Sequence, residues 1–174
     1  SAAAGRDLGS WSRAWLETAG ADTLSTEVGG WVVRHAPPEH PADRPHTFDV
    51  AGWQDGEEVF RVPVIVSEER TQVAALAAAP SAAVVVPNAG DLTWATVELA
   101  PATLDALARQ LGRIPDDGAR AVTWTAVLSG VYRGVVDPRL ALDVFTAAGP
   151  AEAHDTILSR ASTHLVDRVI PCFL

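Results

Sequence analysis

Between residues 28 and 99 short apolar runs alternate with Gly, Pro and Asp, a pattern typical of β-strands and their turns. Every second position from Phe60 to Val66 is apolar, so these side chains share one face of a strand whose other face meets solvent. The Asp-Gly pair at residues 55–56 suits a tight hairpin turn. Six strands are predicted, over residues 31–35, 47–53, 59–66, 71–76, 82–86 and 93–99. No helix of useful length separates them, which favours an antiparallel β-sandwich over a doubly wound sheet.

Apolar residues recur at helical spacing on both sides of this region. Trp11, Trp15 and Leu16 predict a short helix over residues 7–18, with Gly20 as its stop. Four more helices are predicted after Pro101, over residues 101–112, 116–133, 137–149 and 152–169. Short loops between them imply two antiparallel hairpins, the opening of a HEAT- or armadillo-like helical array. The fold class is therefore mixed β then α, α+β by segment.

Four segments follow from this pattern. Residues 1–5 are small and resemble a cloning remnant, and residues 6–21 hold the first helix. Residues 22–99 form the β-sandwich domain, and residues 100–174 form the α-helical domain. Its ending over residues 169–174 is apolar, so we expect it to be truncated and something to pack there. The chain contains no Met, not even an initiator, which suggests processing or excision from a longer protein.

Composition narrows the function classes. With 48% hydrophobic and 20% charged residues, and no apolar run near the ~20 residues of a membrane helix, the chain has the character of a soluble globular protein. Its net charge is −9 and all 13 basic residues are Arg, which argues against a nucleic-acid partner. The single cysteine, Cys172, favours a reducing compartment, and we interpret it as a structural or incidental thiol.

The histidines are the first candidates for chemistry. His35, Glu39 and His40 form H-x-x-x-E-H, which superficially resembles zinc-protease signatures. Those signatures need a helix, and the proline pair at residues 37–38 forbids one, so we interpret the segment as a loop. We expect His46 to be another exposed loop residue.

Other candidates also have a structural interpretation. Ser162, His164 and Asp167, with Asp155 beside His154, are interpreted as a solvated helix face, because a catalytic triad usually draws on several elements. Residues 84–91 are interpreted as a strand and turn, not a phosphate loop. The tryptophans are interpreted as core residues, with exposure of Trp53 as an alternative; they are Trp11, Trp15, Trp31, Trp53, Trp94 and Trp124. We therefore predict no catalytic, cofactor-binding or metal-binding residue.

Two segments resemble a known family. Residues 11–20 (WSRAWLETAG) are similar to the helix that ends the catalytic domain of aminopeptidase N-type zinc aminopeptidases, gluzincin metallopeptidases of the actinobacterial type. Residues 86–99 (VPNAGDLTWATVEL) resemble the strand that leads from their small β-sandwich into their helical C-terminal domain. Residues 119–121 and 132–136 are similar to the opening helices of that domain. The sequence departs from the family at residues 89–90, where acids are usual, and at Trp94, where Tyr is commoner.

The resemblance implies a non-catalytic role for this chain. The zinc motif of the family, H-E-x-x-H with a downstream Glu, lies in a preceding domain, so no site residue carries over and zinc is expected only in the parent. The parent would be a cytoplasmic hydrolase that removes N-terminal residues from peptides. This region would link to the catalytic domain and shape access to its active site. The implied partners are that domain, the remaining C-terminal helices and substrate peptide, with no nucleic acid or membrane.

Two other hypotheses stay open. The chain is alternatively a free-standing protein-interaction module, with an acidic β-sandwich and a helical repeat. A hydrolase that uses the cluster around His164 is a third hypothesis. The apolar face at the end of the chain also predicts self-association if helices that normally continue the array are missing. The coding sequence upstream of Ser1 distinguishes the first two hypotheses: an in-frame H-E-x-x-H supports the aminopeptidase, and a start codon just before Asp7 supports the module.

Overall fold

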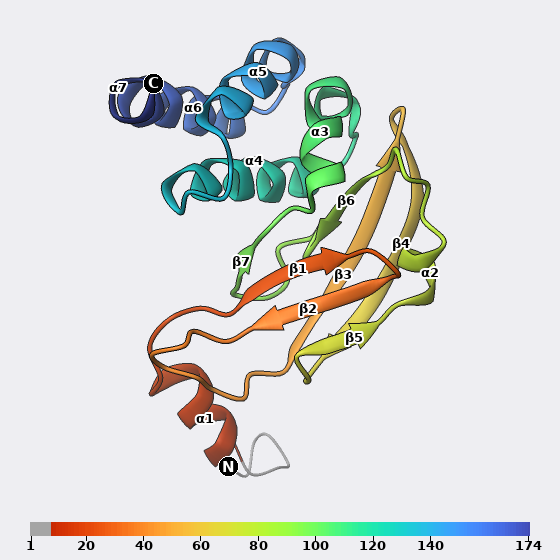
Figure 1. Ribbon diagram of the computed structural model, residues 1–174, viewed down its shortest axis with the longest axis vertical. Coiled ribbons are helices and arrows are strands. Elements are labelled where there is room, and N and C mark those ends of the chain that lie inside the picture. The colour runs from red at the N-terminus through yellow and green to blue at the C-terminus, as the bar shows by residue number, and fades with distance from the viewer. Residues whose placement is uncertain (1–7) are drawn as a thin grey trace.

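The computed structural model describes residues 8–174 and has an α+β architecture of two β-sheets and a group of helices (Figure 1). The expectations for residues 1–5 and for the helix start at residue 7 lie outside the described residues. The strands are β1 (Thr23–Glu27), β2 (Trp31–His35), β3 (His46–Gln54), β4 (Glu57–Val66), β5 (Arg70–Gln72), β6 (Val84–Pro87) and β7 (Thr96–Val97). The helices are α1 (Gly9–Leu16), α2 (Ala74–Ala77), α3 (Pro101–Gln110), α4 (Asp117–Tyr132), α5 (Pro138–Ala148), α6 (Asp155–His164) and α7 (Ile170–Phe173).

The strands form two sheets, in the orders β5-β2-β1-β7 and β4-β3-β6. Their neighbouring strands are antiparallel, as predicted, except that β7 lies parallel to β1. Asp55 and Gly56 connect β3 to β4 with φ angles of 52° and 90°, which confirms the predicted hairpin turn.

The strand predictions fail at three places. β1 was missed, because its run TLSTE holds a single large apolar residue, Leu24. The strand predicted over 71–76 ends at Gln72, and α2 follows from Ala74, since alanine favours a helix. The strand predicted over 93–99 shrinks to Thr96–Val97.

Two clusters of buried apolar side chains hold these layers together. One fills the space between the sheets and includes Leu24, Phe48, Val50 and Val66. The other joins the opposite face of β3 and β6 to the helices, and its members include Ala51, Trp53, Val84, Val86, Leu107, Leu111, Val127 and Val144. The strand β6 and residues 50–53 of β3 are therefore covered on both sides. Trp53 is buried, so the alternative that it is exposed was wrong.

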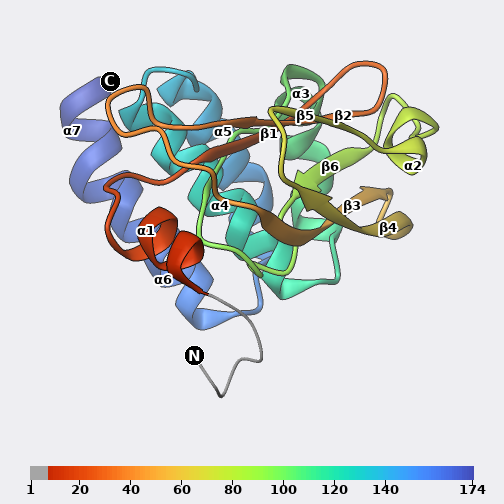
Figure 2. The ribbon, with the colours of Figure 1, turned by 90° about the horizontal axis from the view of Figure 1, so that it is seen from below.

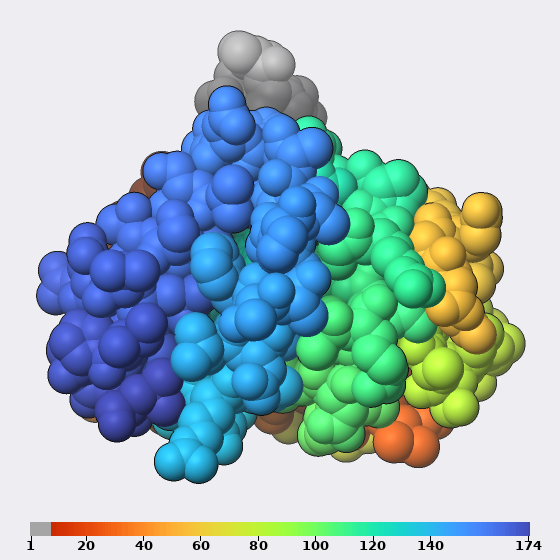
Figure 3. Space-filling model, turned by 90° about the horizontal axis from the view of Figure 1, so that it is seen from above, coloured from red at the N-terminus to blue at the C-terminus, as the bar shows by residue number. Residues whose placement is uncertain are grey.

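Alternate helices make the closest contacts in the helical part, α3 with α5 and α4 with α6. Figure 3 shows the outer side, where α5 lies between α3 and the C-terminal segment. Asp137 accepts a hydrogen bond from the Arg139 backbone N–H at 2.8 Å, which confirms it as the N-cap of α5. The helix predicted over 152–169 begins at Asp155 and passes through a π-helical turn (Leu165–Val169) into α7. Within residues 8–174, each helix is too short or too polar to span a bilayer.

Candidate functional site

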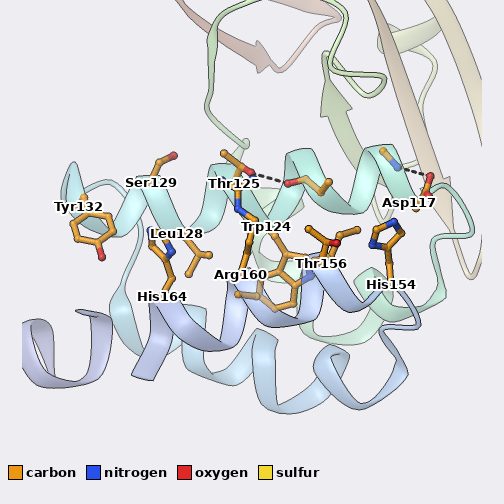
Figure 4. Close-up of a pocket in the computed structure, with 14 residues that line it drawn as sticks. Asp117, Trp124, Thr125, Leu128, Ser129, Tyr132, His154, Thr156, Arg160 and His164 are labelled. Atoms are coloured by element: carbon orange, nitrogen blue, oxygen red, sulfur yellow. Dashed lines mark hydrogen bonds between the residues drawn. The ribbon is translucent and has the colours of Figure 1, made fainter. Parts of the chain in front are cut away.

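An open groove of about 430 Å³ runs between α4 and α6 (Figure 4). Its floor is apolar and mostly buried, and is formed by Trp124 and Leu128 of α4 with Ile157 and Ala161 of α6. In each helix these two residues are four positions apart, so they lie on one face, one turn above the other. The floor side chains therefore serve both as helix–helix packing and as the base of the groove.

Polar side chains form the rim, with Thr125 and Ser129 on α4 and Thr156 and Arg160 on α6. Asp117 and His154 lie at one end, where both helices begin, so α4 and α6 run in the same direction. The groove follows α4 from Asp117 to Tyr132, a length of about 22 Å at the rise of an α-helix.

Aromatic rings close the other end of the groove. The Tyr132 ring packs edge-on against His164, with centroids 6.0 Å apart, and against Phe173, with centroids 5.6 Å apart. This contact ties α7 to α4. It also places His164 at the groove, although its side chain is exposed as predicted for a solvated helix face.

Over residues 8–174, the groove is lined by one formal positive charge, that of Arg160, and one negative charge, that of Asp117. Within the described chain Arg160 has no ion-pair partner, whereas the nearby Arg120 donates two hydrogen bonds of 2.9 Å to Glu152. Burial alone would raise the pKa of Glu152, but the hydrogen bonds from Arg120 and the backbone of His154 lower it below its usual value. Asp117 is the only acid that lines the groove as described, and it accepts a hydrogen bond from the Gly118 backbone.

Ser162, His164 and Asp167, which were interpreted as a solvated helix face, are not joined as a catalytic triad in the described chain. The Ser162 hydroxyl donates to the Ser159 carbonyl at 3.1 Å, and over residues 8–174 no hydrogen bond joins Ser162, His164 and Asp167. Asp155 begins α6 and is exposed. This arrangement offers no activated nucleophile, because a nucleophile needs its base within hydrogen-bonding reach.

A second cluster of polar groups lies beneath α1, with Asp22, Arg44 and His46 fully buried and Arg34 partly buried. The carboxylate of Asp22 accepts hydrogen bonds from Arg44 at 2.7 Å, from Arg34 at 3.0 Å and from His46 Nε2 at 3.1 Å. Arg44 also donates to the backbone carbonyls of Ala14 at 2.7 Å and Thr18 at 3.0 Å. This cluster therefore fastens the end of α1 to the β-sandwich.

His46 lies in this cluster, so the expectation of an exposed loop residue was wrong. The proline-rich loop ends at Pro45, and His46 is the first residue of β3, on a face that turns inward. Its other ring nitrogen, Nδ1, lies 2.8 Å from the Thr93 hydroxyl. Burial lowers the pKa of His46, as do the charges of Arg34 and Arg44, against the opposing effect of Asp22.

The remaining candidates are far from any such arrangement. His35, Glu39 and His40 are exposed, at the end of β2 and in the turn after it, as the loop interpretation predicted. Over residues 8–174 no three His, Cys, Asp or Glu side chains converge as metal ligands would. Cys172 is exposed and unbonded.

Residues 84–91 form β6 and a turn, as interpreted. Asn88 stabilises this turn with its side-chain oxygen, which accepts hydrogen bonds from the backbone N–H groups of Leu92 and Thr93. The prediction that the tryptophans are core residues is wrong for Trp11 and Trp94, which are 45% and 61% exposed.

The groove and the Asp22 cluster were both missed by sequence reasoning. The helix α4 is apolar on almost every face. This pattern was the available signal that a second face, with Trp124 and Leu128, packs against another element besides the face that contains Val122. Nothing local marks Asp22 and Arg44, which are 22 positions apart.

Fold and site together define an α+β region that joins a β-sandwich to packed helices and carries an apolar groove. No known protein-family profile matches the sequence. The chain is similar to Aminopeptidase N of Streptomyces lividans, with 32% identity over 142 residues. The matched part is 70% of this chain but only 17% of the relative, so the chain spans less than a fifth of the relative's length. Most of the chain is thus related to a stretch of an aminopeptidase N.

Proposed function

We propose that this chain is a non-catalytic region of a zinc-dependent aminopeptidase, which links to the catalytic domain and shapes access to the active site. The observation that carries the proposal is the 142-residue match to Aminopeptidase N. Zinc would belong to the longer protein, since the described residues offer no cluster of three possible ligands. The longer protein would act on peptides in the cytoplasm.

The attachment of α1 supports the linking role. By its resemblance to the aminopeptidase N-type enzymes, α1 corresponds to the helix that ends their catalytic domain. Arg44 binds the last turn of α1 and the residues after it through three backbone carbonyls, and Asp22 holds Arg44 in place. A buried, multiply bonded contact of this kind resists rotation, so α1 and the sandwich would move as one body.

The helical part supports continuation into a HEAT- or armadillo-like array. Packing of α3 on α5 and of α4 on α6 is the two-layered arrangement of stacked helical repeats. Val166, Ile170, Phe173 and Leu174 leave a large part of their apolar surface exposed. We propose that further helices of the longer protein cover them, and that the isolated chain self-associates through the same face; a monodisperse monomer at high concentration would contradict this.

The proposal is tested by comparing the 174-residue chain with the longer protein that its gene encodes. Hydrolysis of leucine p-nitroanilide and zinc content are measured for both proteins, with and without a chelator. We expect zinc and chelator-sensitive hydrolysis in the longer protein and neither in the 174-residue chain. Turnover by the pure 174-residue chain, or a gene that encodes no H-E-x-x-H upstream, would overturn the proposal.

The groove favours a second function, that of a free-standing protein-interaction module. Apolar clefts with a few polar groups at the rim are typical binding sites. A start codon just before Asp7 in the source gene would support this function over the first.

A further inference from the structure

The α4–α6 groove offers an apolar floor with one cation in the middle. Figure 4 shows Arg160 extending from α6 toward Thr125 on α4, beside Trp124. The groove continues past Arg160 in both directions, to Asp117 and His154 at one end and to Tyr132 at the other. A ligand that fills the groove therefore meets apolar surface on each side of the guanidinium.

The charges around Arg160 favour an anionic ligand at this position. Within residues 8–174 its guanidinium has no carboxylate partner, although it lies on a strongly acidic chain. His154 and His164 add hydrogen-bond donors, and the acid Asp117 lies at the far end, where it would repel a second carboxylate. Arg160 is exposed in the open groove, and a ligand seated on the apolar floor would exclude part of the water around its pair with a carboxylate, which strengthens the pair.

We propose that this groove binds an unfolded polypeptide segment in which an acidic side chain lies between apolar ones. The acidic side chain would pair with Arg160, and the apolar side chains would pack on Trp124, Leu128 and Ile157. At the rise of an extended chain, the ~22 Å groove accommodates about six residues. The central position of Arg160 selects an acidic side chain within the segment over a carboxylate at its end.

This binding needs no catalysis and stands on the groove alone, so its failure would leave the proposed aminopeptidase role untouched. The test measures the fluorescence anisotropy of a labelled peptide titrated with the 174-residue chain. The peptide has about eight residues, is blocked at both ends and carries one glutamate between leucines. A second peptide has glutamine in place of glutamate, and a third combines that glutamine with a free C-terminal carboxylate.

Three variants locate the binding. Arg160→Gln removes the central charge, and Thr125→Trp fills the groove from an exposed rim position that tolerates a larger side chain. Arg139→Gln is the matched control, since Arg139 is an exposed arginine on α5 outside the groove and, among residues 8–174, has no ion-pair partner. Circular dichroism checks that each variant is folded.

We expect the glutamate peptide to bind about tenfold more tightly than the glutamine peptide. Arg160→Gln should remove that difference, Thr125→Trp should abolish binding of both, and Arg139→Gln should change neither. Equal binding of the first two peptides, preference for the free C-terminus, or equal effects of Arg160→Gln and Arg139→Gln would overturn the proposal. So would the absence of binding by any peptide, or displacement of the peptide by a second copy of the chain as its concentration rises.

Discussion

At the scale of single residues, the buried Asp22 carboxylate organises the contact between α1 and the sandwich. Asp22, Arg44 and His46 are all completely inaccessible to water. A buried charge without a partner is costly, and here the carboxylate is surrounded by two guanidinium groups and an imidazole. The buried groups therefore stabilise one another. Removal of one of them leaves a buried charge without its partner, which lowers the free energy of unfolding.

Replacement of Arg44 by methionine should test this dependence. Arg44→Met keeps the approximate length of the side chain but leaves Asp22 with one guanidinium fewer and three backbone carbonyls without this donor. We expect the free energy of unfolding in urea to fall by about 3–5 kcal/mol. The control is Arg113→Met, which breaks the exposed pair with Asp55 and should cost about 0–1 kcal/mol. Similar losses in both variants would argue against the special role of the buried cluster.

His46 should make stability depend on pH in a defined direction. Its pKa in the folded protein is lowered by burial, so the unfolded chain binds a proton more readily than the folded chain does. The stability that His46 contributes is complete above its pKa in the unfolded chain, about 6.5, and is lost as the pH falls below that value. We expect the free energy of unfolding to fall from about pH 7.5 to about pH 5.5, with a slope of at most about 1.4 kcal/mol per pH unit from this group.

The variant His46→Gln should flatten this dependence, because the titrating group is gone. His40→Gln provides the control, since His40 is exposed in the turn after β2 and should leave the slope unchanged. A wild-type slope that persists in His46→Gln would assign the pH dependence to other groups.

At the scale of elements, the β1–β2 hairpin depends on close contact with α2. Gly30 closes the turn with a φ of +83°, and its carbonyl accepts a hydrogen bond from the Val73 backbone N–H at 2.8 Å. A Cβ atom at Gly30 would lie 2.5 Å from the Cβ of Ala77 and 2.7 Å from its backbone nitrogen. The turn thus needs glycine for its conformation and for the space beside α2.

The variants Gly30→Ala and Gly134→Ala separate these two requirements. Gly134 has a φ of +71° but open space around its Cβ position, so its substitution should cost only the backbone strain of about 1–2 kcal/mol. Gly30→Ala adds the clash with α2, and we expect it to destabilise the fold by clearly more than Gly134→Ala in thermal and urea unfolding. Equal losses would mean that α2 moves aside without cost.

At the scale of the whole molecule, the sandwich and the helices share one apolar core. Trp53 and Val84 of the sheet and Leu107 and Leu111 of the helical part belong to the same buried cluster. Ion pairs such as that of Arg61 with Asp116, at 2.6 Å, cross the same boundary at the surface. The division of the chain at residue 99 stays a prediction, but the shared core favours unfolding of both parts together.

Leu107→Ala tests this coupling. Leu107 is fully buried, and the cavity left by the truncation should lower the free energy of unfolding by about 2–5 kcal/mol. We expect hydrogen–deuterium exchange to accelerate in β3 as well as in α4, because loss of helical packing weakens the sheet beneath it. Faster exchange confined to the helices would show that the two parts unfold independently.

The sequence alone determined the features that depend on local periodicity and on turn chemistry. Alternation from Phe60 to Val66, the Asp-Gly turn and the Asp137 cap each depend on residues a few positions apart, so the order of strands before helices could be predicted. Only the tertiary structure decided which distant segments meet. It buried His46 against Asp22, placed β7 parallel to β1, and formed the groove by packing α4 on α6, since such contacts depend on the path of the whole chain and leave no local pattern.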